Sequence, residues 1–219
     1  MFKVYISAST QNKNIGVNGY GTEEENMFLL ANKVKDILVS TGKFQVFRNS
    51  RNWSLSETVA DCNSKDCDIF IDNHTNSAST NAEGTEVFYY GQGGTSSKSF
   101  KLSSLLYGEI ANVSIGKDRG LKADTDYFKT GLFVIQNTVP PSSLIEHFFH
   151  SNVKEVDFFK NNVDKFAEAE AKAICKYFGV DLKPIENEVQ ILKNKVKYFE
   201  DKFSELEQFV NQVKNYGGE

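Results

Sequence analysis

Apolar positions along the chain fall into short runs and longer periodic stripes. The short, nearly continuous apolar or aromatic runs predict strands; they cover Phe2–Ser7, Phe44–Arg48, Asp68–Asn73, Thr85–Tyr90, Leu132–Gln136 and Ser143–Phe148. Between them, apolar residues recur every three or four positions, which predicts helices over Glu24–Ser40, Ser97–Ile110 and Asn162–Phe178. Strands that alternate with helices of this length indicate an α/β fold, with a mostly parallel twisted sheet flanked by helices.

A second kind of periodicity begins after Pro184. Apolar residues follow one another in alternating steps of four and three, without a slip, at Ile185, Val189, Leu192, Val196, Phe199, Phe203, Leu206, Val210 and Val213. This heptad seam predicts a long C-terminal coiled-coil helix. The chain is therefore expected to consist of one domain over residues 1–181 and a coiled-coil helix over residues 182–219.

The charges beside the seam favour pairing of this helix with its own copy. In a parallel dimer the facing flank positions would be opposite in sign at Glu188–Lys193, Lys195–Glu200 and Lys202–Glu207. We therefore expect a homodimer through residues 185–213. A single helix folded back on the first domain is the alternative, and the bulk of Phe199 and Phe203 leaves a trimer or tetramer open.

Composition narrows the function classes. The 219 residues are 40% hydrophobic and 25% charged, which is ordinary for a globular protein. A net charge of −4 argues against nucleic acid as a partner, and no apolar run approaches the roughly 20 residues of a membrane helix. Three cysteines without a Cys-x-x-Cys pair (Cys62, Cys67 and Cys175) are expected to be small buried residues.

The N-terminus enters a strand pattern directly, so no secretory signal is predicted. If the substrate lies outside the cytoplasm, the protein needs another route of exit or has been cut to a mature form. Synthesis in the cytoplasm fits this pattern.

Two residues stand out as candidates for chemistry. His74 ends an apolar run that opens into polar residues, so it is expected at the carboxyl end of a strand, where α/β sites form. Glu146 lies inside an apolar strand, where an unpaired carboxylate costs several kcal/mol, so it requires a cation, a metal or a raised pKa. A hydrogen-bonded rim histidine and an ion pair with an arginine are the structural alternatives.

Three consecutive glutamates, Glu23 to Glu25, open the first predicted helix. Acidic residues there oppose the helix dipole favourably, and Thr22 with Glu25 has the spacing of a capping box. Capping alone explains this triplet without any role in a site.

Five segments, in this order, resemble zinc-dependent N-acetylmuramoyl-L-alanine amidases of the amidase type 3 family, in particular a branch found in clostridia and their phages. The segments are Tyr5–Gln11, Gly19–Met27, Asp68–Ser77, Gly84–Tyr90 and Leu144–Asn152. The resemblance extends over about residues 2–180. It implies that residues 1–181 form a catalytic domain that cleaves the amide bond between N-acetylmuramic acid and L-alanine in bacterial cell-wall peptidoglycan.

The resemblance also implies a site. Glu23 and His74 fall on the family's metal ligands and Glu146 on its catalytic glutamate. The first ligand, usually a histidine, is replaced by the sequence Ser9-Thr10-Gln11, where Gln11 is the candidate and Thr10 or a water is the fallback. Because an amide oxygen is a poorer donor to zinc than imidazole, weaker zinc affinity is expected, and manganese or cobalt becomes more plausible.

The implied mechanism is hydrolysis by zinc-activated water, with Glu146 accepting the water proton and passing it to the leaving nitrogen. Asn76 and Arg119 could contact substrate, but the favoured interpretation of both is that they are solvated loop residues. Two alternatives remain: a zinc peptidase or carboxypeptidase of other bond specificity, and a non-catalytic wall-binding protein.

Overall fold

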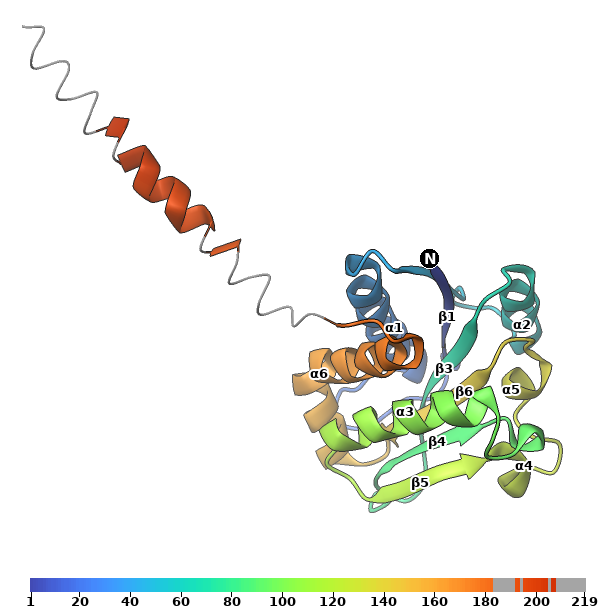
Figure 1. Cartoon of the computed structure of the whole chain (residues 1–219). Helices are drawn as coiled ribbons and strands as arrows, with labels where there is room; N and C mark the ends of the chain where they lie inside the picture. Colours follow the sequence, from blue (N-terminus) through green and yellow to red (C-terminus); the bar gives the residue numbers. More distant parts are fainter. Residues whose placement is uncertain (183–191, 194, 205, 208–219) are drawn as a thin grey trace, which may run out of the picture. The chain divides into compact units, whose positions relative to one another are not determined.

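A computed structural model describes residues 1–182, 192–193, 195–204 and 206–207. The chain divides into two compact units, Met1–Asp181 and Leu182–Glu219. The first unit is built around a six-stranded sheet (Figure 1). In the part of the chain that the structure describes, no helix is both long and apolar enough to cross a membrane.

The sheet has the strand order β2-β1-β3-β6-β4-β5. Its strands are β1 (Phe2–Ala8), β2 (Phe44–Arg48), β3 (Ile69–Asn76), β4 (Thr85–Tyr89), β5 (Asp118–Ala123) and β6 (Ser142–Phe149). All neighbouring strands are parallel except β4 and β6, which are antiparallel. As a result, the starts of β4 and β5 lie at the same edge as the ends of β1, β3 and β6.

Helices cover both faces of the sheet (Figure 1). They are α1 (Glu23–Ser40), α2 (Leu55–Ser64), α3 (Lys98–Val113), α4 (Asp124–Tyr127), α5 (Phe133–Asn137) and α6 (Val153–Phe178), with a short 3-10 turn at Gly91–Gly93. Helices α2 and α5 pack on one face, where Val59, Cys62, Val134 and Ile135 join Tyr5, Phe70, Phe88 and Leu144 in one apolar cluster. Helix α6 covers the opposite face, where Phe166 packs edge-on against His147.

The α/β architecture predicted from the sequence is confirmed, with one reversed strand pair in a mostly parallel sheet. The predicted strand at Leu132–Gln136 is wrong, because Phe133–Asn137 is a short helix. The Asp124 carboxylate accepts from the Leu132 amide at 2.9 Å and the Gln136 side chain at 2.7 Å, which stabilises that turn. The helix predicted from Asn162 is the second half of α6, which has non-helical backbone angles at Asn162.

In the second unit, the described residues of the segment 192–207 are helical. The described members of the heptad seam all have exposed side chains; they are Leu192, Val196, Phe199, Phe203 and Leu206. Ile185, Val189, Val210 and Val213 lie outside the described residues. The pairing of this helix with a second copy stays a prediction.

Candidate active site

The candidate residues meet at the edge where β3 and β6 end and α1 begins. His74 in β3 and Glu146 in β6 are register partners in adjacent parallel strands. Because cross-strand partners project to the same side of a sheet, both side chains lie on the face that carries Phe70 and Leu144. The site therefore lies on the same face of the sheet as the apolar cluster under α2 and α5, at the carboxyl ends of β3 and β6.

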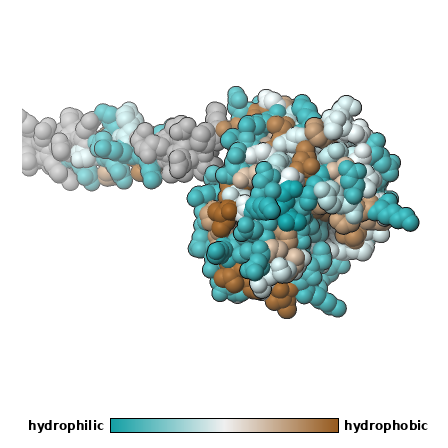
Figure 2. All heavy atoms as spheres, turned by 90° about the horizontal axis from the view of Figure 1, so that it is seen from below, coloured by the Kyte–Doolittle hydropathy of each residue, from teal (hydrophilic) through white to brown (hydrophobic). Residues whose placement is uncertain are grey.

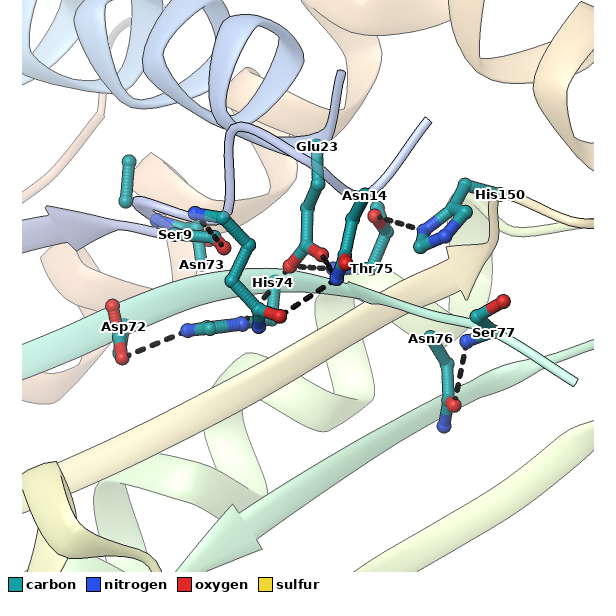
Figure 3. Close-up of polar contacts among 12 residues, drawn as sticks. Ser9, Asn14, Glu23, Asp72, Asn73, His74, Thr75, Asn76, Ser77 and His150 are labelled. Carbon is teal, nitrogen blue, oxygen red and sulfur yellow. Dashed lines mark hydrogen bonds and ion pairs between the residues drawn. The ribbon is translucent and has the colours of Figure 1, made fainter. Parts of the chain in front are cut away.

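Glu23 reaches His74 from the first turn of α1 (Figure 3). Its Oε1 lies 3.0 Å from His74 Nδ1, and both side chains are almost completely buried. The capping box is present as well, formed by Thr22 and Glu25. Since the cap uses the third glutamate of the triplet, the first is left to face the site.

Asp72 contacts the other imidazole nitrogen of His74, Nε2. Its Oδ2 lies 3.0 Å from His74 Nε2, because residues two apart in a strand share a face. Burial alone would lower the pKa of His74, but the carboxylates of Asp72 and Glu23 raise it well above its usual range. In the metal-free protein His74 is therefore an imidazolium that donates to two carboxylates.

Glu23 is held in its charged form. Burial would raise its pKa, but hydrogen bonds and charge from His74, together with the Asn14 and Ser9 side chains, lower that pKa below its usual value. Asn14 Nδ2 donates to Glu23 Oε2 at 2.8 Å, and the Thr75 amide donates to Oε1 at 3.3 Å. Both carboxylate oxygens of Glu23 thus have fixed positions.

Glu146 is held in its neutral form. Burial raises its pKa to about 8, and the carboxylates of Glu23, Glu86 and Asp72 add to this effect against the opposing charge of His74. Its Oε2 is shielded from solvent and has no hydrogen-bond partner in the described part of the chain. The arginine ion pair considered as its structural explanation is not found among the described residues. The Glu146 carboxyl group thus has one unsatisfied oxygen and interacts electrostatically with His74, Glu23, Glu86 and Asp72.

Gln11 lies on the loop between β1 and α1, at the margin of this group. Its Oε1 accepts from Asn14 Nδ2 at 2.7 Å, and the same nitrogen donates to Glu23. The amide of Asn14 therefore links the oxygen of Gln11 to the carboxylate of Glu23. The structure brings Gln11 close to the site through this bridge without a direct contact to His74.

The other two histidines do not join the group. His147 faces α6, where its Nε2 lies 2.7 Å from Asn73 Oδ1, and burial lowers its pKa to about 3. His150 Nδ1 lies 2.9 Å from the Thr75 hydroxyl. Both are buried histidines that organise the backbone around β3.

A metal ion at this site would need donors of mixed kinds. Within the described residues, no three His, Cys, Asp or Glu side chains converge as a metal-binding group. Glu23 and His74 supply two donors, with an oxygen and a nitrogen 3.0 Å apart, a separation close to that of two ligands sharing one zinc ion. The third protein donor would have to be a neutral group. The Gln11 amide implied by the resemblance reaches Glu23 only through Asn14, whereas the Asn14 and Ser9 side chains contact Glu23 directly. The residues present fit a metal with this weaker set.

The sequence analysis missed two residues of the site and misplaced two others. Asp72 and Glu86 were not selected, although the Asp-x-His spacing on a predicted strand would have placed Asp72 on the face of His74. Asn76 and Arg119 were interpreted as loop residues. Instead they lie on β3 and β5, and both donate to Glu86.

A neutral carboxyl group beside a carboxylate–imidazole pair, at the carboxyl end of an α/β sheet, is an arrangement suited to hydrolysis. The fold and site thus define the chain as a hydrolase. A family model described as N-acetylmuramoyl-L-alanine amidase, Amidase_3, matches residues 4–176. The chain belongs to this amidase family.

Individual relatives agree with this assignment. The uncharacterized protein YqiI of Bacillus subtilis is 29% identical over 181 residues, which cover 81% of this chain and 82% of YqiI. The N-acetylmuramoyl-L-alanine amidase LytC of the same organism is 25% identical over 180 residues, covering 80% of this chain but 35% of LytC. The catalytic domain of CwlV, an amidase from Bacillus (Paenibacillus) polymyxa, superposes with a TM-score of 0.71 at 25% identity, over 83% of this chain and all of that domain.

Proposed function

We propose that this chain is an N-acetylmuramoyl-L-alanine amidase that acts on bacterial cell-wall peptidoglycan, cleaving the bond between N-acetylmuramic acid and L-alanine. Family membership over residues 4–176 supports the reaction. Within the site, the main support for this function is that His74 and Glu146 are register partners in β3 and β6, and that Glu23 Oε1 lies 3.0 Å from His74 Nδ1.

Zinc is the proposed cofactor, and Glu23, His74 and Gln11 are the residues that would hold it. When bound, zinc supplies a Lewis acid that polarises a carbonyl and lowers the pKa of water to about 7. Asp72 would orient His74 by accepting from its Nε2, which leaves Nδ1 directed toward Glu23.

Glu146 is the proposed general acid and base. In the metal-free protein it carries a proton, because burial raises its pKa to about 8. A neighbouring cation favours the ionised form and would bring that pKa toward neutrality. Glu146 could then accept a proton from the attacking water and donate it to the L-alanine nitrogen as the amide bond breaks. The Glu146 carboxyl group, whose Oε2 has no hydrogen-bond partner among the described residues, is the group proposed for both transfers.

A digest of purified muropeptides, resolved by mass spectrometry, tests the bond specificity. We expect free peptides that begin with L-alanine, together with glycan carrying unsubstituted lactyl groups. Release of C-terminal amino acids would instead indicate a carboxypeptidase. An unchanged digest with metal-loaded protein would favour a wall-binding protein without catalysis.

We also propose that residues 185–213 join two copies of the chain. The support is the heptad pattern and the exposure of Leu192, Val196 and Phe203, which leaves the described part of the seam uncovered. Two linked catalytic domains would raise the effective concentration of each on a polymeric wall.

A further inference from the structure

A second charged group lies directly beside Glu146. Glu86 in β4 is the antiparallel register partner of Glu146, so their Cα atoms are roughly 5 Å apart and their side chains share a face. The Glu86 side chain is buried and collects three donors. Asn76 Nδ2 donates to its Oε1 at 2.7 Å, Arg119 Nε to its Oε2 at 3.1 Å, and Lys122 Nζ forms an ion pair with the same Oε2.

Arg119 reaches this position because β5 is irregular there. Thr85 pairs with Asp118, but the next residue, Glu86, pairs with Gly120, so Arg119 is an inserted residue in a β-bulge. Gly120 adopts a φ of +91°, a conformation that side-chain-bearing residues rarely take. Bulges commonly redirect a side chain next to an active site. Here the bulge allows Arg119 to reach Glu86, on the face that also carries Glu146.

The guanidinium of Arg119 is only partly used by the protein. It contacts Glu86 through Nε alone, and its side chain is 34% exposed. Its carbon Cζ lies 4.9 Å from the centre of the Phe149 ring, a cation–π contact. Its two terminal nitrogens, Nη1 and Nη2, make no hydrogen bond within the described residues. These nitrogens are available for bidentate hydrogen bonding to a carboxylate.

Lys122 adds a second cation. Its Nζ lies 4.6 Å from the centre of the Tyr127 ring and 5.7 Å from that of Phe88. The cluster of Glu86, Arg119 and Lys122 has one negative and two positive groups, so it keeps a net positive charge. The neighbouring Glu23 and Asp72 are acidic, so this positive charge is confined to the β4–β5 side of the site. The face shown in Figure 2 is largely hydrophilic, with small separate apolar areas.

We propose that Arg119 and Lys122 form a subsite for a carboxylate of the stem peptide, on the leaving-group side of the cleaved bond. This inference rests on the proposed function. If Glu146 donates a proton to the L-alanine nitrogen, the acyl side of the bond faces Glu23 and His74, and the departing peptide extends past Glu146 toward Glu86. The residue after L-alanine in the stem is D-glutamate, whose α-carboxyl is free in some walls and amidated in others. The free carboxylate is the group that the two cations select.

A pair of muropeptides that differ only in amidation of this α-carboxyl tests the proposal. The native chain is expected to cleave the free acid with a higher kcat/KM than the amide. Arg119→Gln should lose about 10- to 100-fold in kcat/KM on the free acid, the range of one hydrogen bond to a charged group. It should change little on the amidated substrate, so that the discrimination collapses. Lys122→Met should act in the same direction.

Lys176→Met is the matched control, because it removes the same charge at a distant place. Lys176 lies in α6 and forms an ion pair with Glu109 in α3. This variant should leave the preference between the two substrates unchanged. Equal cleavage of both substrates by the native chain would overturn the proposal, as would an equal slowing of both by Arg119→Gln. Should Arg119→Gln fail to fold, the comparison within the native chain still decides.

A binding measurement separates this proposal from the proposed function. Calorimetry with the dipeptide L-alanyl-D-glutamate and its α-amide requires no catalysis. Tighter binding of the free acid supports the subsite even if no amide bond is cleaved. Equal or absent binding of both dipeptides, in a chain that cleaves peptidoglycan, rejects the subsite and leaves the amidase intact.

Discussion

His74 and Glu146 occupy the same register position of two adjacent parallel strands. Their relative placement is therefore set by the backbone hydrogen bonds of β3 and β6, which lie in the middle of the sheet. A slip of one residue between these strands would send Glu146 to the face covered by α6. In the loop between β1 and α1, by contrast, the Gln11 side chain is held by one exposed hydrogen bond, from Asn14.

Replacing Glu146 tests its role in proton transfer. Glu146→Gln keeps the shape of the side chain but cannot exchange a proton, so turnover should fall by about 10²–10⁴-fold while zinc content stays the same. Muropeptide cleavage and elemental analysis measure the two quantities. Glu83→Gln, at an exposed position, is the control. Loss of zinc from the Glu146→Gln variant would show that Glu146 is a metal ligand.

Metal binding should displace a proton from His74. The carboxylates of Asp72 and Glu23 raise the pKa of this residue, so at neutral pH it is protonated, whereas a metal requires the neutral ring. Zinc affinity should therefore rise with pH, with about one proton released per ion. Calorimetry in two buffers of different ionisation enthalpy measures this release. Chelator should abolish cleavage, zinc should restore it, and undiminished zinc binding by His74→Ala would refute the ligand assignment.

The third ligand can be identified by exchange at Gln11. If its amide oxygen holds the metal, Gln11→His should tighten zinc binding and Gln11→Ala should weaken it. Competition with a chromogenic chelator gives the affinities. Asn14→Ala is the comparison, because Asn14 supports Glu23 and its loss should cost about 10- to 100-fold in affinity. If neither Gln11 variant changes zinc affinity, something else completes the site.

Glu170, on the face of the sheet covered by α6, should make the free energy of unfolding depend on pH. Burial raises its pKa to about 7, despite a hydrogen bond from Asn73 and the charge of Arg48. Between pH 4.5 and 7 the native state holds a proton that the unfolded state has released, so Glu170 makes the free energy of unfolding fall as pH rises.

Glu170→Gln removes this titration. Relative to the native chain, the variant should gain about 3 kcal/mol in unfolding free energy between pH 4 and pH 8. Urea unfolding of metal-free protein across this range measures the gain. Glu168→Gln, at an exposed position of the same helix, should show none. A pH-independent difference between Glu170→Gln and the native chain would contradict the assignment.

Truncation tests the C-terminal helix. Light scattering on the intact chain should give a dimer, and a chain ending at Asp181 should be monomeric. A monomeric intact chain would rule out pairing through residues 185–213.

The central strands could be predicted because each is a long apolar run that ends in polar residues. β3 and β6 are buried over most of their length; His74 was found from that contrast, and Glu146 because it is a carboxylate inside an apolar strand. The strand β5 was missed, since Asp118, Arg119 and Lys122 give an edge strand the composition of a loop. The run at Leu132–Gln136 was misassigned because four consecutive apolar residues do not distinguish a strand from a short buried helix.

The site could be predicted only in part. The capping box and the contact to His74 belong to different glutamates; the spacing assigned the first to Glu25, whereas only the resemblance implied the second for Glu23. The cluster around Glu86 depends on the antiparallel placement of β4 and on a bulge, neither of which leaves a periodic signal.

The reversal of β4 and β5 separates the proposed hydrolytic residues from the proposed recognition residues. Glu23, His74 and Glu146 belong to strands and a helix start that meet at one edge, whereas Arg119 and Lys122 belong to β5, which runs in the opposite direction; the connections at residues 77–84 and 114–117 lead into β4 and β5. Gly84 and Phe149 are tied to the Glu155 carboxylate, at 2.9 Å each, so these connections start from a fixed base. For enzyme engineering, substitutions confined to β5 and to the two connections are thus expected to alter substrate recognition without moving the proposed hydrolytic residues.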